Sequence, residues 1–317
     1  MVATTLVEQT FFNVVSMSTW PSSLEQLRGT VGIWTLTHES LPPSRSGEVA
    51  SELESLGYSA MWIGEAWGRE AFTDATLLLS ATSRITIATG IANIWARDAV
   101  NCANATKTLC AAFDDRFVLG LGVSHAPLVK RMRGHDYATP LATMRDYLTA
   151  MDAAPMISIE GHQPYARVLA ALGPKMLQLA ADMTDGVLPY LVTAQHTAQA
   201  RASVGDKFIG VEQAVVLGEN REEFLRRAHD HLEIYTGLDT YRNSWRRLGF
   251  DNDDFVRGGS DRLCDAMVVH GDEAVILASI DEHRDAGADH VCLQVLGADS
   301  ATPPLAEWRR IAKAFTT

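Results

Sequence analysis

Eight apolar segments, each followed by a stretch of helical sequence, constrain the fold of this 317-residue chain more than any other feature. The fourth segment, residues 117–123 (FVLGLGV), is almost continuously apolar, which is typical of a strand covered on both faces. Alternation of strand and helix predicts a parallel α/β sheet, and eight units at this length favour a (β/α)8 TIM barrel over an open doubly wound sheet. We expect the strands at residues 31–36, 60–64, 84–94, 117–123, 166–172, 185–192, 208–218 and 290–297.

The domain prediction is a single barrel over residues 29–317, preceded by an N-terminal extension over residues 1–28. Residues 1–16 match no element of the alternating pattern, so we expect part of the extension to be poorly ordered. Residues 236–269, between the seventh and eighth strands, have no clean helical or strand period. We interpret this segment as insertion helices that cover one face of the barrel.

Composition limits the partners of the chain. A formal net charge of −12 disfavours nucleic acid and anionic membrane surfaces as partners. No run of residues approaches the roughly 18 apolar positions of a membrane span. The four cysteines are scattered and form no C-x-x-C pair, as is usual in a reducing compartment. We therefore expect a cytoplasmic protein that acts on a small molecule.

Motifs for several kinds of chemistry are missing from the sequence. The ten histidines include no H-E-x-x-H pattern, and we expect His229, His231 and His283 to be solvated helix residues, with no metal site. There is no G-x-S-x-G elbow for a hydrolase, no Walker loop and no G-x-G-x-x-G. A bound organic cofactor is then the expected agent of any redox chemistry.

Three tryptophans fall at or just past the carboxyl ends of successive strands, where α/β barrels place their sites. Trp34, Trp67 and Trp95 together predict an aromatic substrate pocket suited to a planar molecule. Gly90 interrupts the third strand, and indicates either a bulge pressed against a flat ring or simple packing.

The fifth strand runs directly into a helix, which makes its end a candidate anion site. Leu172, Gly173 and Lys175 lie at the helix N-terminus, where free backbone N–H groups and the helix dipole favour phosphate. An ordinary strand–helix turn is the alternative.

Four segments together resemble the luciferase-like flavin and deazaflavin oxidoreductases, specifically their coenzyme F420-dependent branch. They are RITIATGIANIWARDA (84–99), RFVLGLGVSHAP (116–127), RGHDYATPLATMRDYL (133–148) and RVLAALGPKMLQLAADMTDGVLPYLV (167–192). The resemblance covers roughly residues 30–297 and implies a (β/α)8 barrel that binds its cofactor at the carboxyl ends of the strands. It also implies that dimers are common, so a homodimer is expected.

The resemblance carries cofactor-binding roles onto five places in this chain. A non-prolyl cis peptide bond behind the cofactor ring would match Gly90–Ile91, and Asn93 would reach the polar edge of the ring. The remaining implied contacts are Gly122, Val123 and Ser124 beside the ring, Ala170, Ala171, Leu172, Gly173 and Lys175 at the phosphate, and Pro189 and Tyr190 at the cofactor tail.

The chain departs from the sugar-phosphate-oxidising members of that branch. Those members carry Asp-His after the second strand and Glu after the fourth, where this chain has Glu65-Ala66 and His125. We expect His125 to be the catalytic proton donor or acceptor, because imidazole titrates near neutral pH. Glu65 would orient His125 or the substrate. A structural role for His125, in hydrogen bonding to residues 133–139, is the alternative.

The function implied is hydride transfer between coenzyme F420 and a small organic substrate. The first alternative is an FMN-dependent monooxygenase of the same superfamily. The second is a non-catalytic barrel that binds a cofactor without turnover.

Overall fold

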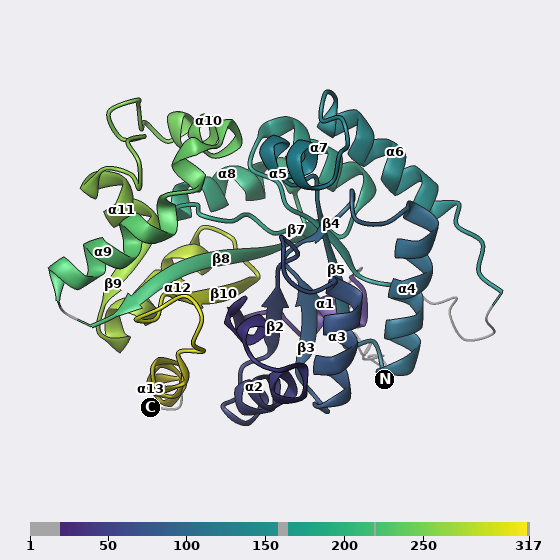
Figure 1. Cartoon of the computed structure of the whole chain (residues 1–317), viewed down its shortest axis with the longest axis horizontal. Coiled ribbons are helices and arrows are strands. Elements are labelled where there is room, and N and C mark those ends of the chain that lie inside the picture. The colour runs from purple at the N-terminus through teal and green to yellow at the C-terminus, as the bar shows by residue number, and fades with distance from the viewer. Residues whose placement is uncertain (1–19, 158–163, 219, 316–317) are drawn as a thin grey trace, which may run out of the picture.

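The fold was determined from a computed structural model, which describes residues 20–157, 164–218 and 220–315. Eight parallel strands form a closed barrel with helices on the outside (Figure 1). The last strand pairs with the first at Val31–Val291 and with the seventh over Gly210–Val215, and these two pairings close the barrel. The barrel strands are β1 (Thr30–Trp34), β2 (Ala60–Ile63), β3 (Thr86–Thr89), β5 (Phe117–Gly122), β6 (Arg167–Leu169), β7 (Gly186–Val187), β8 (Phe208–Leu217) and β10 (His290–Val295). The prediction of a TIM barrel is therefore confirmed, and the alternative of an open doubly wound sheet is excluded.

The helices pack on the barrel through apolar stripes. In α2 (Pro43–Ser55), for example, Val49, Ala50 and Leu53 are buried on one face. The other helices that surround the barrel are α3 (Ala71–Ser80), α4 (Ala99–Ala112), α5 (Ala126–Met132), α6 (Pro140–Asp152), α7 (Pro174–Met183), α8 (Ala194–Val204), α12 (Glu273–Asp285) and α13 (Leu305–Ala314), with a 3₁₀ turn η1 (Thr37–Ser40).

The N-terminal end of the barrel is closed by a short helix, α1 (Ser22–Glu25). Leu24 and Leu27 are fully buried and belong to the same apolar cluster as the inward-facing Trp62 and Val118. This part of the expected extension is thus packed against the barrel. The expectation for residues 1–16 lies outside the described residues.

The expected third strand, residues 84–94, is two strands in the structure. β3 ends at Thr89 and β4 (Ala92–Asn93) follows after a cis peptide bond between Gly90 and Ile91. A Cβ added at Gly90 would lie 2.7 Å from Nε1 of Trp34, so the close approach requires glycine. The expected fifth and sixth strands are also too long, since β6 and β7 end at Leu169 and Val187.

A strand that the sequence did not predict, β9 (Val268–Gly271), pairs with the second half of β8. β7 pairs only with the start of β8, at Phe208 and Ile209, while β9 pairs with Ala214–Leu217. The segment VVHG was missed because four residues carry no readable period. It lies at the end of the region that we expected to be an insertion.

The chain between β8 and β9 folds as a helical layer with its own apolar core. It contains α9 (Arg221–Leu232), η2 (Tyr235–Gly237), α10 (Asp239–Arg247) and α11 (Asp261–Met267). Phe224, Trp245 and Leu263 are buried in this second core. Figure 1 shows α10 on the same side of the molecule as α5 and α7.

Among the described residues, no helix is both long enough and apolar enough to cross a membrane.

Candidate functional site

A cavity of about 270 Å³ lies at the carboxyl ends of the barrel strands. Most of the residues proposed from the sequence line it, although they come from six different strand ends. The substrate-pocket and catalytic residues that line the cavity are Trp34, Trp67, Glu65 and His125, and the cofactor-binding residues are Gly90, Ile91, Gly122, Val123, Ser124, Ala170, Ala171, Leu172, Gly173 and Tyr190.

Four proposed residues do not line the cavity. The indole Nε1 of Trp95 donates to the Val123 carbonyl at 2.9 Å, and its ring packs on His135 and Tyr137, so Trp95 supports the wall from behind. Lys175 is exposed in the first turn of α7. Asn93 is 1% exposed and accepts from Trp95 N, and Pro189 is buried. The direct contacts expected of these four residues are not supported by the shape of the cavity.

Gly90 and Ile91, which are joined by a cis peptide bond, line the cavity together with Gly122, and these three residues form what we call the platform. Trp34 Nε1 donates to the Gly90 carbonyl at 2.7 Å and fixes this bulge. A Cβ at Gly122 would lie 2.5 Å from Cγ1 of Ile91, so glycine is required there for β5 and the bulge to approach closely. The result is an apolar surface on which a planar ring can lie.

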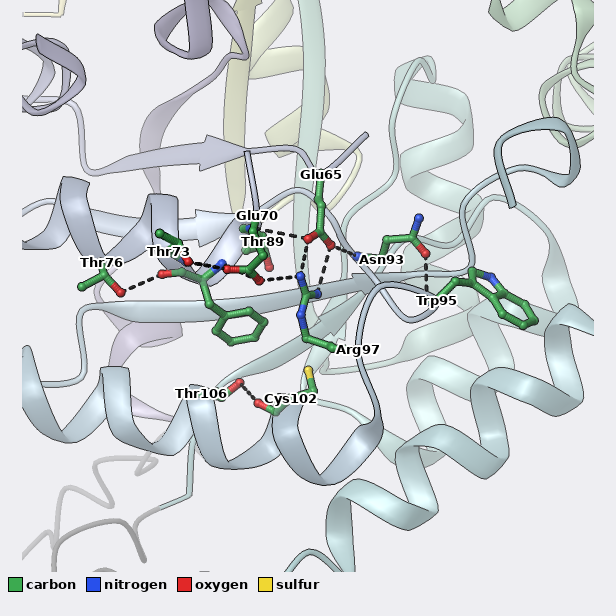
Figure 2. A network of polar contacts seen from close by, with 12 residues as sticks. Glu65, Glu70, Thr73, Thr76, Thr89, Asn93, Trp95, Arg97, Cys102 and Thr106 are labelled. Carbon is green, nitrogen blue, oxygen red and sulfur yellow. Dashed lines mark hydrogen bonds and ion pairs between the residues drawn. The ribbon is translucent and has the colours of Figure 1, made fainter. Parts of the chain in front are cut away.

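Glu65 lines one side of the cavity, but its carboxylate is bound to the protein. Arg97 Nη1 donates to Glu65 Oε2 at 3.0 Å, and Asn93 N donates to the same oxygen at 2.7 Å. Arg97 also pairs with Glu70, which caps α3 (Figure 2). Burial would lower the pKa of Arg97, yet its hydrogen bond and charge interaction with Glu65 raise that pKa. Glu65 makes no hydrogen bond to His125 among the described residues, so the predicted orienting contact is absent there.

His125 stands at the N-terminus of α5, directly after Ser124, whose φ is 55°. Its Nδ1 is buried and has no hydrogen-bond partner within the described part of the chain. Burial lowers the pKa of His125 to about 4, so the imidazole is neutral at pH 7. The alternative role in binding residues 133–139 falls instead to Ser124, whose carbonyl accepts from Tyr137 Oη at 2.8 Å.

The helical layer supplies one wall of the cavity, as expected of an insertion over one face of the barrel, but the sequence did not predict which of its residues line the cavity. Ile234, Tyr235, Thr240 and Tyr241 line the cavity, and the Tyr241 ring lies 5.6 Å from that of His125. The only signal in the sequence was a cluster of aromatic residues without a period, which could not be assigned to a strand end.

A hydrogen-bonded pair of phenols links this wall to the barrel. Tyr190 Oη donates to Oε1 of Gln294 at 2.7 Å and lies 3.0 Å from Tyr235 Oη. Burial raises the pKa of both tyrosines, to about 12 for Tyr235. Both phenols are therefore neutral.

Glu212 on β8 is a buried acid that sequence reasoning also missed. It is 0% exposed; Leu191 N donates to its Oε2 at 2.9 Å, and its Oε1 has no partner in the described residues. Burial raises its pKa to about 8, which keeps it protonated at neutral pH. The signal was present, since a glutamate inside the apolar run FIGVEQAVVLG is unusual.

The candidate anion site lies where β6 leads into α7. Gly173 lines the cavity and is the N-cap of α7, so the positive end of the helix dipole lies at this end of the cavity. Pro174 has no N–H group, and the N–H groups of Met176 and Leu177 donate to the Gly173 carbonyl. Arg247 from α10 donates to the Leu172 carbonyl at 2.9 Å, and this guanidinium is a cation that the sequence did not predict there.

One expectation about histidines is wrong. His283 is 2% exposed and bonds to Thr197 Oγ1 and Gln213 Oε1, both at 2.9 Å, because α12 packs this face against β8 and α8. His231 is also enclosed, since its Nε2 is buried and its ring lies 5.5 Å from that of Tyr235.

A closed parallel barrel with a bulged third strand and an apolar cavity at its carboxyl end defines a class of oxidoreductase barrels. The sequence model for luciferase-like monooxygenases matches residues 29–290, and the chain belongs to this family. The family resemblance expected from the sequence is therefore confirmed.

The individual relatives share only about a quarter of their residues with this chain. The chain is 26% identical over 302 aligned positions to a Mycobacterium tuberculosis protein named as a coenzyme F420-dependent oxidoreductase, covering 77% of this chain and 86% of the relative. It is 26% identical over 190 positions to the 5,10-methylenetetrahydromethanopterin reductase of Methanolobus tindarius, covering 55% of this chain and 57% of that protein.

Solved structures support the fold. An F420-dependent secondary alcohol dehydrogenase in complex with an F420–acetone adduct superposes with a TM-score of 0.69 at 14% identity, covering 90% of this chain and 97% of that one. The oxygenating component of 3,6-diketocamphane monooxygenase from Pseudomonas putida, in complex with FMN, gives 0.64 at 15% identity, covering 89% and 95%. Both a deazaflavin and a flavin are thus bound by proteins of this fold.

Proposed function

We propose that the chain is a coenzyme F420-dependent oxidoreductase that transfers a hydride between F420 and a small organic substrate. The observation that carries the proposal is the platform of Gly90, Ile91 and Gly122 in a largely apolar cavity. The two relatives described above, one named as F420-dependent and one a reductase, favour a reductase-type reaction over an oxygenase.

The residues present fit such a cofactor. Glycine at positions 90 and 122 lets the bulge pack closely against Trp34 and β5, and Gly90, Ile91 and Gly122 all line the cavity. The N-terminus of α7 at Gly173, with the Arg247 guanidinium beside it, would receive the phosphate. When bound, the cofactor would accept or supply the hydride at C5 of its deazaflavin ring.

The protein would contribute three things to the reaction. The platform positions the ring, and the apolar walls exclude water. His125, which has no bonded partner among the described residues, gives or takes the substrate proton. The charge of Glu65 is already neutralised by Arg97. Glu65 would therefore position the substrate only through the shape that it gives to the wall.

The test is equilibrium titration of the full-length chain with F420 and, separately, with FMN. We expect F420 to bind at least about tenfold more tightly, which is about 1.4 kcal/mol of preference. A Gly122→Val variant should lose binding because its side chain would collide with Ile91 and displace the platform. Gly237→Ala is the matched control, since a Cβ at Gly237 meets no atom within 4 Å.

The two alternatives give different results in the same titration. Preference for FMN would favour the monooxygenase, which the FMN-bound structural relative supports. Binding of neither cofactor would overturn the proposal. Binding of F420 without turnover on any alcohol, ketone, imine or enone would favour a non-catalytic barrel.

Two finer expectations remain proposals. We infer a homodimer from the family resemblance, which sedimentation velocity of the purified chain would test. We also infer a cytoplasmic location, which fractionation of cells that express the chain would test.

A further inference from the structure

The described residues that line the cavity include no lysine or arginine, and the carboxylate of Glu65 is paired with Arg97. Two guanidinium groups lie outside the lining. Arg133 donates to the Ala66 carbonyl at 3.4 Å, and Arg247, which donates to the Leu172 carbonyl, is the cation of the candidate phosphate site. When the cofactor phosphate occupies that site, a substrate anion would have no counter-ion among the lining residues, and burying an unpaired charge is costly.

The hydroxyl groups that line the cavity differ in whether they are free. Those of Tyr190 and Tyr235 are bonded to each other, and Tyr190 is bonded also to Gln294. Tyr241 is different, because its hydroxyl makes no hydrogen bond to any other residue that the structure describes. Its ring is held by Trp245 at 5.6 Å and Tyr235 at 4.8 Å, so its position is fixed without the hydroxyl.

His125 also lines the cavity, and it lies beside Tyr241. The ring centroids are 5.6 Å apart at 48°, and the imidazole makes no hydrogen bond to another residue of the described chain. Its Nδ1 is buried, so Nε2 is the nitrogen that can meet a ligand. Two neutral groups with unused hydrogen-bonding capacity therefore meet at one point of a wall whose other hydroxyl residues are Ser124, Thr240 and the paired tyrosines. A ligand in the cavity can supply the partner that both groups lack.

We propose that Tyr241 and His125 together bind the oxygen atom of a neutral substrate, an alcohol or the corresponding aldehyde or ketone. This inference rests on the proposed function. In the oxidising direction the carbon–oxygen single bond becomes double, the hydride passes to the deazaflavin, and the hydroxyl proton passes to His125. Tyr241 donates a hydrogen bond to the oxygen throughout. The reverse direction returns the proton from His125 to the oxygen.

Two probes of equal size and shape test the charge preference. Cyclohexanecarboxamide is neutral and cyclohexanecarboxylate is an anion, and each is titrated calorimetrically into the F420-loaded protein and into the cofactor-free protein. In the F420-loaded protein, where the phosphate fills the site beside Arg247, we expect the amide to bind at least about tenfold more tightly, because the anion would be buried unpaired.

Two variants test the role of Tyr241. Tyr241→Phe keeps the ring and removes the hydroxyl, so amide affinity should fall about three- to tenfold while F420 affinity stays constant. For ketone reduction the same variant should lower kcat/KM by a similar factor. Tyr58→Phe is the matched control; it removes a hydroxyl that donates to the Trp308 carbonyl at 2.9 Å, outside the lining of the cavity.

Either of two results would overturn the inference. One is a carboxylate that binds the F420-loaded protein as tightly as the amide, and the other is a Tyr241→Phe variant indistinguishable from Tyr58→Phe. Failure of the proposed function would look different, because F420 would not bind at all. The amide titration on the cofactor-free protein would still report the effect of Tyr241.

Discussion

Two polar regions lie at the same end of the barrel and differ in how fully their groups are bonded. In the first, the Glu65 carboxylate is bound by Arg97 and by backbone N–H groups of Ala71 and Asn93. In the second, His125 and Glu212 each keep one buried atom without a partner among the described residues. Both regions are buried, so exposure to water does not explain the difference.

The difference separates a structural polar cluster from a functional one. An unsatisfied buried polar atom costs free energy, and a fold retains it where a ligand or a reaction uses it. The Glu65 region fixes the loop after β2. Of the two groups in the second region, His125 lines the cavity, whereas Glu212 is fully buried outside the lining. We therefore expect substitutions in the first region and at Glu212 to change stability, and substitution of His125 to reduce turnover.

The largest effect is expected for His125→Ala. Loss of the proton donor or acceptor should lower kcat about 10²- to 10⁴-fold, with F420 affinity retained. The free energy of unfolding should change by less than about 1 kcal/mol, because the imidazole has no bonded partner to lose. Steady-state kinetics and urea denaturation of the same preparation measure the two quantities.

The control for this variant is His135→Ala, which removes an exposed imidazole from the neighbouring loop. It should leave kcat within about twofold, as surface substitutions usually do. Unchanged turnover and unchanged cofactor affinity in His125→Ala would show that His125 is not catalytic.

Arg97→Met tests the first region, where we expect a loss of stability. It leaves the Glu65 carboxylate, whose side chain is 4% exposed, without its counter-ion. Removing one partner of a buried ion pair typically costs about 3–5 kcal/mol of unfolding free energy. The double variant Glu65→Gln/Arg97→Met should recover part of that loss in urea denaturation. A single variant as stable as the parent would mean that the pair does not hold the loop.

Glu212→Gln should change how stability depends on pH. The pKa of Glu212 is about 8 in the folded protein and near 4.5 when unfolded, so between these values the unfolded chain binds fewer protons. This raised pKa therefore lowers stability as pH rises from about 4.5 to 8. Between pH 5 and 7, the parent should lose about 2–3 kcal/mol relative to Glu212→Gln. Parallel stability curves for the two proteins would contradict a protonated Glu212.

The smallest effect is expected for Trp95→Phe, which removes the hydrogen bond to Val123 from behind the wall. Stability should fall by about 1 kcal/mol, and F420 affinity should stay within a few-fold. Trp34→Phe is the contrasting variant, because it frees the Gly90 carbonyl at the platform and should weaken F420 binding more. If Trp95→Phe and Trp34→Phe weakened F420 binding equally, Trp95 would contact the cofactor, contrary to its position behind the wall.

The sequence predicted the parts of this molecule that depend on local pattern. β1, β2 and β5 lie within two residues of their apolar runs, and its position at a strand end identified His125 as a residue of the cavity. β6 and β7 were overestimated, because the apolar residues that follow them continue into the cavity wall instead of the sheet. Leu191, with a φ of 53°, shows where the extended chain ends after β7.

What the sequence did not predict depends on contacts between distant segments. Tyr241 meets His125 across more than a hundred residues, and no local pattern encodes that contact. The pairing of Arg97 with Glu65 was missed for the same reason, since neither position has a periodic signature. The family resemblance predicted the platform residues, but it assigned no role to any residue of the helical layer.

The pairing of β9 with β8 has a consequence for how this protein can diversify. The helical layer leaves the barrel at the end of β8 and returns through β9, so both of its ends are anchored to the same strand. Substitutions or length changes between these anchors leave the β8–β10 closure and the platform in place. Natural variation in the helical layer can therefore change which substrate is accepted while the platform that would hold the cofactor stays the same.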